Sequence, residues 1–328
     1  MDNKIATMNC VDNFSYKTPI KFDLEILKKE TDEYQNDLTA TKTSKNNAAS
    51  LCRRLLSFKK GDMFLANEDP RFFIDEMTGT SKGNTARVYY NPSYTQYPRI
   101  VRKAIVPMNE ENKFVYLDIK SAEYILNCIF AGDEKTLEIY RNGGDPYLAY
   151  KDEFPEGTTR DQMKTALIAN MYGMSAFTLG KRLGISEIAA KQILKSINRS
   201  RPAQLMLNME ITMRATSNGA YFCPDGINKE RILKVADIDP EVGYSENRAL
   251  SVYTQSALGV WMQSKIKEVQ EFVAQNSTLI TVFDSILFEV HKDTDESQIK
   301  SQIEALVAPF RADIGFGVNF YEAQISAR

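Results

Sequence analysis

Histidine is nearly absent from this sequence of 328 residues, which contains His291 and no other. Catalysis by a histidine base, or metal binding by a histidine-rich site, is therefore not expected. Cysteine is also scarce, because Cys10, Cys52, Cys128 and Cys223 are scattered along the chain with no CxxC pair among them. This spacing is typical of reduced intracellular thiols and argues against a disulfide framework or a zinc knuckle.

The sequence also lacks long apolar runs, internal repeats and low-complexity tracts. No apolar stretch approaches the roughly 20 residues that cross a bilayer, and the first residues do not have the charged-then-apolar layout of a secretory signal. With 43% hydrophobic and 26% charged residues, the composition is ordinary for a soluble globular protein. We therefore expect a cytoplasmic protein of one large domain or two to three packed subdomains, with no membrane partner.

Neither sign of charge is in large excess, because the formal net charge is −2. A global balance can still hide local basic surfaces, and these decide whether a protein contacts nucleic acid. Two basic segments stand out, from Lys42 to Lys60 and from Pro98 to Lys103. A solvated helix face is the commoner explanation of such a cluster, so the two segments alone leave both interpretations open.

Hydrophobic periodicity and turn residues predict an α+β chain. The expected helices are 21–35, 45–58, 121–131, short ones after Asp133 and after Asp145-Pro146, a long one from Arg160 that Thr159 and Gln162 cap, 186–199, 202–217, and one from Ser245 toward Gln275. The expected strands are 114–119, 278–283 and 286–290, with a hairpin over 221–235. Local hairpins and grouped helices favour α+β over a parallel βαβ array.

Two aspartates lie at the ends of apolar strands. Asp118 ends the first strand, and Asp284 lies in a link of two residues, Asp284-Ser285, that forces its two strands into a hairpin. A buried lone carboxylate is costly unless it meets a cation or a donor. If both strands join one antiparallel sheet, the carboxylates meet at its edge, and two hard oxygen ligands suit Mg²⁺. The alternative is that each aspartate only caps a turn, which is the commoner case for an isolated one.

The long helix from Arg160 carries a stripe of cationic, apolar and aromatic residues. Arg160, Lys164, Ile168 and Tyr172 recur at every fourth position, so they share one face of the helix. Two cations one turn apart, followed by an apolar and an aromatic residue, can hold a triphosphate and then its base. An exposed charged face that merges into core contacts would give the same pattern.

Five segments resemble motifs of the family A (polymerase I-like) DNA polymerases, and they occur in that family's order. RDQMKTALIANMYGMSAFTLGKRLGIS (160–186) resembles the fingers-helix motif, LDIKSAEYILNCIFAGDE (117–134) the first palm motif, and TVFDSILFEVHKD (281–293) the last palm motif. NRALSVYTQSA (247–257) is similar to the helix along the primer–template minor groove, and TARVYYNPSYTQYP (85–98) to a segment near the primer end. The chain is similar to a minimal form of the family, without exonuclease domains and most of the thumb.

The resemblance implies a right-hand polymerase with an antiparallel-sheet palm and helical fingers, and with a thumb that is reduced or absent. Residues 1–75 are then an N-terminal helical region or reduced thumb, 76–150 and 236–328 the two parts of the palm, and 151–235 the fingers. The implied reaction is template-directed addition of dNTPs to a primer 3′-end by two-metal phosphoryl transfer, without proofreading. The implied location is the cytoplasm, that of the bacterial host if a phage or mobile element encodes the chain.

The resemblance also implies roles for individual residues. Asp118 and Asp284, with the backbone carbonyl of Ile119, would bind two Mg²⁺ ions, for which Mn²⁺ can substitute. Arg160 and Lys164 would neutralise the triphosphate, and Lys164 could protonate the leaving group. Asp118, Asp284 and Lys164 are thus the expected catalytic residues.

Further residues match positions that contact the nucleotide or the duplex. Tyr172 would pack near the template base and the incoming nucleotide, and Glu123 matches the steric gate that crowds a ribose 2′-hydroxyl. The residues expected along the primer–template are Arg87, Arg248, Gln255 and Ser285. DNA primer–template and dNTPs are the expected partners, and an accessory protein could supply a thumb or processivity.

Three positions depart from the family's pattern and leave alternatives open. Ile168 stands where the family has Phe or Tyr, Phe283 where it has His, and Ser285 where it has Glu. Ile168 and Ser285 favour a single-subunit phage-type RNA polymerase, whereas Glu123 favours a DNA polymerase, because those RNA polymerases usually carry glycine there. A catalytically silent nucleic-acid-binding subunit is a third alternative, and the retained aspartates and cations argue against it.

Overall fold

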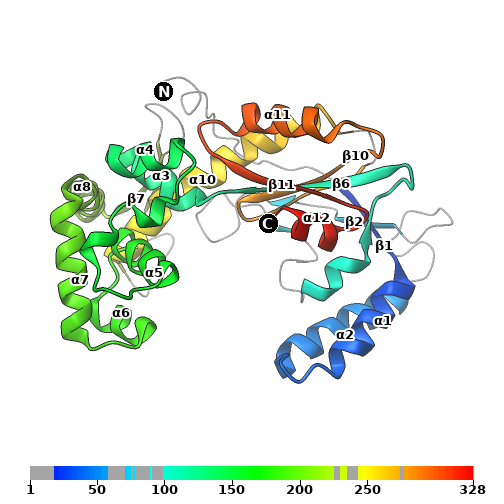
Figure 1. Cartoon of the computed structure of the whole chain (residues 1–328), viewed down its shortest axis with the longest axis horizontal. Coiled ribbons are helices and arrows are strands. Elements are labelled where there is room, and N and C mark those ends of the chain that lie inside the picture. The colour runs from blue at the N-terminus through cyan, green and yellow to red at the C-terminus, as the bar shows by residue number, and fades with distance from the viewer. Residues whose placement is uncertain are drawn as a thin grey trace.

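The computed structural model describes residues 18–57, 71–74, 77–78, 89–90, 99–224, 230–234, 243–273 and 277–327. Figure 1 shows a central sheet with helices on both faces, a group of helices on one side of it, and a helix pair on the other. All pairings between the described strands are antiparallel. The predicted α+β class is therefore confirmed.

The central sheet has four strands in the order β11-β6-β10-β9. They are β6 (Asn112–Ile119), β9 (Leu279–Val282), β10 (Ser285–His291) and β11 (Ala312–Gly317). In Figure 1, α11 (Glu296–Val307) lies over one face of the sheet and α12 (Phe320–Ser326) over the other. Because both faces are covered, the middle strands β6 and β10 are buried along most of their length and read as nearly continuous apolar runs.

Two glycines allow α12 to pack directly on β11. A Cβ atom at Gly315 would lie 2.2 Å from the carbonyl oxygen of Ala323, and one at Gly317 would lie 2.3 Å from the amide nitrogen of Ala323. No side chain fits in such spaces, so a larger residue at either position would push α12 off the sheet. Phe320 of α12 is fully buried, with its ring centroid 5.8 Å from that of Tyr116 on β6. This packing holds β11 in place beside β6.

The helical group on the left of Figure 1 follows β6 in the chain. It contains α3 (Ala122–Ala131), α4 (Glu134–Arg141), the short 3₁₀ turns η3 (Pro146–Leu148) and η4 (Lys151–Glu153), α5 (Arg160–Met171), α6 (Ala176–Leu183), α7 (Glu187–Ser200), α8 (Pro202–Asn218) and the hairpin of β7 (Ala220–Pro224) and β8 (Glu230–Lys234). α5 begins with both hydrogen bonds of the predicted capping box between Thr159 and Gln162.

A 25-residue helix, α10 (Glu246–Gln270), links the helical group to the sheet. It contacts α3, α8 and β7 on one side and α11 on the other. Trp261 in its middle is 1% exposed, and its ring meets that of Phe310 edge-on at 4.7 Å between centroids. α10 therefore packs on both regions and fixes one against the other.

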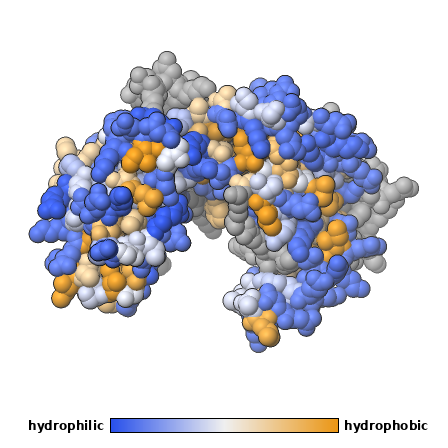
Figure 2. Space-filling model, viewed as in Figure 1, coloured by the Kyte–Doolittle hydropathy of each residue, from blue (hydrophilic) through white to orange (hydrophobic). Residues whose placement is uncertain are grey.

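The described N-terminal elements include a helix pair on the side of the sheet away from the helical group (Figure 1). They are β1 (Thr18–Phe22), α1 (Leu24–Gln35), α2 (Lys42–Ser57), β2 (Arg71–Ile74), β3 (Met77–Thr78), β4 (Tyr89–Tyr90), η2 (Arg99–Ala104) and β5 (Ile105–Val106). Strands β2, β1 and β5 form a small sheet in that order. Figure 2 shows the molecule hollowed between the α1–α2 pair and the helical group.

Several predicted element boundaries were wrong. The first helix does not begin at residue 21, because Lys21 and Phe22 pair with β5 and Asp23 caps α1. The helix expected after Asp145-Pro146 is only the 3₁₀ turn η3, and α10 ends at Gln270 rather than Gln275. In the described part of the chain, no helix is long and apolar enough to cross a membrane. The division into palm and fingers stays a prediction.

Candidate active site

Asp118 lies near the end of β6, between two neighbouring strands. Its Cα partners are Ser285 on β10 and Asp313 on β11. Asp284 lies in the turn between β9 and β10, and the amide of Ile119 donates a hydrogen bond to the carbonyl oxygen of Asp284 at 3.1 Å. The sheet therefore brings the two aspartates to one edge, although they are far apart in the sequence.

The turn that carries Asp284 corrects one sequence prediction. Ser285 pairs with Val282, so the two linking residues are Phe283-Asp284 rather than Asp284-Ser285. Phe283 and Ser121 have φ angles of +59° and +56°, and they are the two non-glycine residues with positive φ in the described part of the chain. A backbone conformation of this kind costs about 1–3 kcal/mol and is commonly retained at functional sites. Both strained residues lie within three positions of one of the two aspartates.

A pocket of about 550 Å³ opens at this edge of the sheet, and we call it the edge pocket. Seven residues that the sequence singles out line it: Asp118, Ile119, Glu123, Arg160, Lys164, Ile168 and Asp284. The structure thus collects in one cavity the predicted metal ligands, the predicted steric gate and three of the four members of the predicted helical stripe.

The two carboxylates of the edge pocket suit a hard cation. Asp118 and Asp284 are both half-buried, and no group of three or more His, Cys, Asp or Glu residues that could hold a metal ion occurs among the described residues. Two carboxylates that leave other positions to water and phosphate oxygens match the preference of Mg²⁺. The charge of the site acts on Tyr116, where burial and then the Asp118 charge raise the pKa of the hydroxyl. A role for the Ile119 carbonyl stays a prediction.

α5 reaches the pocket along its predicted stripe. Arg160, Lys164 and Ile168 line the cavity, and Tyr172 forms the C-cap of the helix. The Tyr172 hydroxyl donates a hydrogen bond to Oε2 of Glu123 at 2.6 Å. The fourth member of the stripe therefore reaches the pocket through Glu123 rather than by lining it.

Two ion pairs in the pocket were not anticipated from the sequence. Arg160 Nε lies 2.5 Å from Asp145 Oδ2, and Lys120 Nζ lies 2.5 Å from Asp313 Oδ1. The hydrogen bond with Asp145 is the main reason why the pKa of the Arg160 guanidinium is raised. The Arg160 and Asp145 side chains are 47% and 26% exposed, and such solvent-accessible pairs contribute only about 0–1 kcal/mol. A ligand anion can therefore displace the carboxylates at small cost.

Sequence reasoning also missed two further residues of the pocket wall, Tyr147 and Arg311. The Arg311 guanidinium donates to the carbonyl oxygens of Tyr140 and Gly144 at 2.9 and 3.2 Å. The alternation of Ile314, Phe316 and Val318 after Arg311 was an available signal for a strand there. Nothing local in the sequence shows that this strand pairs with β6.

Of the residues predicted to contact a duplex, Arg248, Gln255 and Ser285 do not line the edge pocket. Arg248 and Gln255 are half-buried on α10. Ser285 is 1% exposed and lines a smaller cavity of about 280 Å³ together with Asp118 and Asp284. Arg87 lies outside the described residues. The roles of these four residues stay predictions.

Paired carboxylates at the end of an antiparallel sheet, beside cations from a helix, are a combination that could hold metal ions and phosphate groups. A family model described as DNA polymerase family A matches residues 90–322. Because this match covers more than half of the chain, the chain belongs to DNA polymerase family A. The resemblance read from the sequence motifs is confirmed.

Individual relatives agree with this assignment. DNA polymerase I of Streptococcus pneumoniae is 25% identical over 276 residues, which cover 77% of this chain and 31% of that protein. DNA polymerase I of Lactococcus lactis subsp. cremoris is 24% identical over 276 residues, with the same coverage. The chain thus spans about a third of the length of the curated relatives it matches.

A solved structure has the same fold. The POL domain of Pol1 from M. smegmatis, in complex with DNA primer-template and dNTP, superimposes with a TM-score of 0.71 at 16% sequence identity. The match covers 93% of this chain and 68% of that one. The architecture described above is therefore that of a polymerase domain.

Proposed function

We propose that the chain is a template-directed DNA polymerase that adds dNTPs to a primer 3′-end by nucleotidyl transfer. The observation that carries the proposal is the joint placement of Asp118 and Asp284 from the sheet and Arg160 and Lys164 from α5 in one pocket. A triphosphate needs metal ions and positive side chains together, because charge spreads over its oxygens in the transition state. The names of the curated relatives support the same activity.

Asp118 and Asp284 hold two Mg²⁺ ions in this proposal, with the Ile119 carbonyl as an additional ligand, and Mn²⁺ can substitute. When bound, the ions lower the pKa of the primer hydroxyl and stabilise the charge on the phosphates. The protein itself contributes by keeping the two carboxylates close together. The hydrogen bond from Ile119 to the Asp284 carbonyl supports this, since it ties the turn to the end of β6.

Arg160 and Lys164 bind the triphosphate. The Arg160 guanidinium can bind phosphate oxygens through two parallel N–H groups, and it leaves Asp145 at little cost because that pair is solvent-accessible. The Lys164 ammonium can donate a proton to the leaving pyrophosphate as a general acid. Ile168, one turn further along α5, offers an apolar contact to the sugar or base.

Glu123 and Tyr172 select the sugar and position the base. The Tyr172 hydroxyl holds the Glu123 carboxylate at 2.6 Å, so the carboxylate cannot swing away without losing a charge-assisted hydrogen bond. A ribose 2′-hydroxyl that approached this pair would have to displace it. A deoxyribose is therefore preferred.

Along the duplex, we propose contacts from Arg248, Gln255, Ser285 and Arg87. Basic residues of α2 add phosphate contacts that weaken with salt. In the same proposal, the palm comprises 76–150 and 236–328, the fingers 151–235, and residues 1–75 a reduced thumb. Absence of proofreading, a cytoplasmic location and an accessory protein are parts of the proposal that rest on the sequence alone.

A second candidate is a phage-type RNA polymerase, which Ile168 in the pocket favours because it is not aromatic. The test is extension of a primer–template with dNTPs or with rNTPs in the presence of Mg²⁺. Clearly faster use of dNTPs supports the proposal, and equal or faster use of rNTPs overturns it in favour of the second candidate. Binding of primer–template without extension in either Mg²⁺ or Mn²⁺ would instead indicate a silent subunit.

A further inference from the structure

Tyr147 lies between the two cations of α5 and the protein interior. It is the middle residue of η3, is 2% exposed, and lines the edge pocket. The guanidinium carbon of Arg160 lies 5.0 Å from the centroid of its ring, and the ammonium of Lys164 lies 5.4 Å from the same centroid. One aromatic ring therefore contacts both residues that are proposed to bind the triphosphate.

Tyr147 also packs against a second tyrosine, Tyr124. The rings of Tyr147 and Tyr124 are stacked, with centroids 4.9 Å apart and planes inclined by 27°. The guanidinium carbon of Arg201 lies 5.2 Å from the centroid of the Tyr124 ring. We call Tyr147 and Tyr124 the tyrosine stack. Buried residues fix the position of this stack, because Tyr124 is 1% exposed and Arg201 is 2% exposed.

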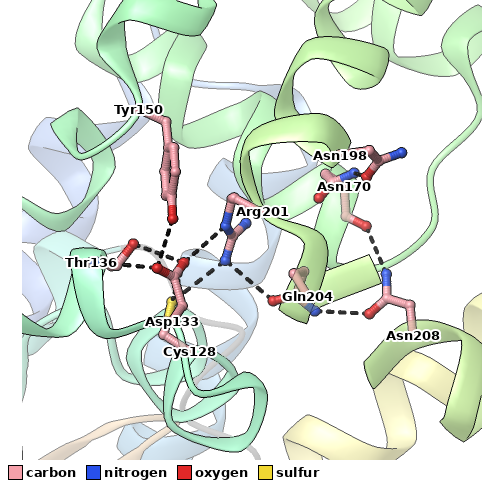
Figure 3. Close-up of polar contacts among 9 residues, drawn as sticks. All are labelled: Cys128, Asp133, Thr136, Tyr150, Asn170, Asn198, Arg201, Gln204 and Asn208. Carbon is pink, nitrogen blue, oxygen red and sulfur yellow. Dashed lines mark hydrogen bonds and ion pairs between the residues drawn. The ribbon is translucent and has the colours of Figure 1, made fainter. Parts of the chain in front are cut away.

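Arg201 is itself fixed by the polar residues drawn in Figure 3. Its Nε lies 3.0 Å from Oδ2 of Asp133. The Asp133 carboxylate also accepts hydrogen bonds from the Tyr150 hydroxyl at Oδ1 and from the Thr136 hydroxyl at Oδ2. Burial opposes ionisation of Asp133, but Arg201 and these hydrogen bonds outweigh it, so the pKa of the carboxyl is lowered. Arg201 is thus held as a buried cation against the back of the tyrosine stack.

The residues of Figure 3 also reach the far end of α5. We call the residues labelled in Figure 3 the buried support of α5. Arg201 donates to Gln204, Gln204 donates to Asn208 at 2.8 Å, and Asn208 donates to the carbonyl oxygen of Asn170 at 3.3 Å. Asn170 in turn donates to Asn198 at 2.6 Å. The tyrosine stack near the start of α5 and the asparagines near its end therefore share one buried support.

We propose that Tyr147 is a positioning residue for triphosphate binding: its ring face holds Arg160 and Lys164 at the wall of the edge pocket before the ligand arrives. The negative face of an aromatic ring attracts a cation, and a side chain that is already placed loses less freedom on binding. The proposal deepens the proposed function and rests on it. Tyr147 acts through the two cations.

The decisive comparison is between Tyr147→Phe and Tyr147→Leu. Phenylalanine keeps the ring and removes the hydroxyl, whereas leucine keeps an apolar side chain and removes the ring. The probe is inorganic tripolyphosphate, and the measurement is its dissociation constant for the full chain by calorimetry, without primer–template. We expect Tyr147→Phe to bind within about twofold of the wild type and Tyr147→Leu to bind about tenfold more weakly, since the leucine variant loses two cation–π contacts.

A matched control separates this role from ordinary packing. Tyr221 on β7 is also fully buried and stacked on a tyrosine, Tyr244, at 6.2 Å, but it does not line the edge pocket. Tyr221→Leu should lower the melting temperature and leave tripolyphosphate affinity unchanged. If Tyr147→Leu lowers the melting temperature but keeps wild-type affinity, Tyr147 only fills the core and the proposal is overturned. Tyr147→Met gives the same contrast if the leucine variant does not fold.

A double-variant cycle tests that Tyr147 acts through the cations. In the background of Arg160→Gln and Lys164→Gln, the further change Tyr147→Leu should have no effect on tripolyphosphate affinity. A tenfold effect that persists in this background would show a direct or unrelated role.

The difference in tripolyphosphate affinity between the Tyr147 variants can be measured without DNA synthesis. Failure of the wild type to extend a primer would overturn the proposed function, whereas equal affinities of the phenylalanine and leucine variants would overturn the role of Tyr147.

Discussion

The edge pocket and the buried support of α5 contain the same kinds of ion pair at opposite degrees of burial. In the edge pocket, Lys120 and Asp313 are 35% and 40% exposed. In the support, Arg201 and Asp133 are 0% and 4% exposed and lie 3.0 Å apart. A solvent-accessible pair exchanges partners at little cost, whereas a buried pair leaves an uncompensated charge when one member is lost. Exposure therefore separates charges that can meet a ligand from charges that hold the fold.

Among substitutions that test this distinction, the largest expected effect is the loss of catalysis when a carboxylate of the edge pocket is removed. Asp284→Asn should lower primer extension by at least about a thousandfold, since loss of one charge-stabilising group in phosphoryl transfer acts on that scale. Asp284 lies in a turn and is only half-buried, so the melting temperature should change little. Primer extension and affinity for primer–template would be measured together. Substantial residual extension, or lost DNA affinity, would contradict the assignment of Asp284 to the metal site.

The buried pair should show the reverse behaviour. Arg201→Met leaves Asp133 charged and unpaired, so the free energy of unfolding should fall by about 3–5 kcal/mol, as measured by denaturant titration. Adding Asp133→Asn removes that charge while keeping the cap of α4, and should restore part of the stability. The exposed pair is the control, because Asp313→Asn should cost no more than about 1 kcal/mol. If Arg201→Met and Asp313→Asn lowered the free energy of unfolding equally, burial would not distinguish the two ion pairs.

The two regions also differ in how much the sequence could predict. Asp118 and Asp284 were found because an apolar strand that ends on a carboxylate is a local pattern, and the start of α5 was found through its capping box. Asp313 was missed because its place beside Asp118 depends on β11 pairing with β6, a contact between distant segments. The turn at Phe283 was misplaced by one residue, because a phenylalanine with positive φ is contrary to local preference.

The buried support could not be predicted for a related reason. Arg201 falls between two predicted helices, where an arginine is normally solvated, and only the packing of α3, α7 and α8 buries it. Tyr147 was expected in a helix and instead lies in the middle of a 3₁₀ turn, stacked on Tyr124. Patterns within one element locate strands and caps. They do not reveal which side chains of different elements meet.

A smaller expected effect tests whether the exposed ion pair of Arg160 and Asp145 gives way to a ligand. Asp145 accepts a hydrogen bond from Arg160, and in the proposed function it competes with the triphosphate for this guanidinium. Asp145→Asn should therefore tighten binding of the incoming nucleotide by about two- to fivefold, the equivalent of one exposed ion pair. Asparagine can keep the cap of η3, in which Asp145 accepts from the Tyr147 amide. The KM for dNTP in primer extension reports the change. A higher KM would mean that Asp145 assists Arg160 instead of competing with the triphosphate.

The smallest effect concerns pH and tests whether the buried pair is ionic in the folded state. The pKa of Asp133 is lowered from its ordinary value of 3.8, so the unfolded chain binds a proton at that residue before the folded chain does. Its contribution to stability is therefore complete above about pH 4 and declines as the pH falls through the folded-state pKa. The stability difference between wild type and Asp133→Asn should narrow between pH 7 and pH 3. The other carboxylates titrate in both proteins, so they do not change this stability difference. A difference that stays constant would mean that Asp133 does not lose its charge in this range. A difference that widens would mean that its folded-state pKa is raised.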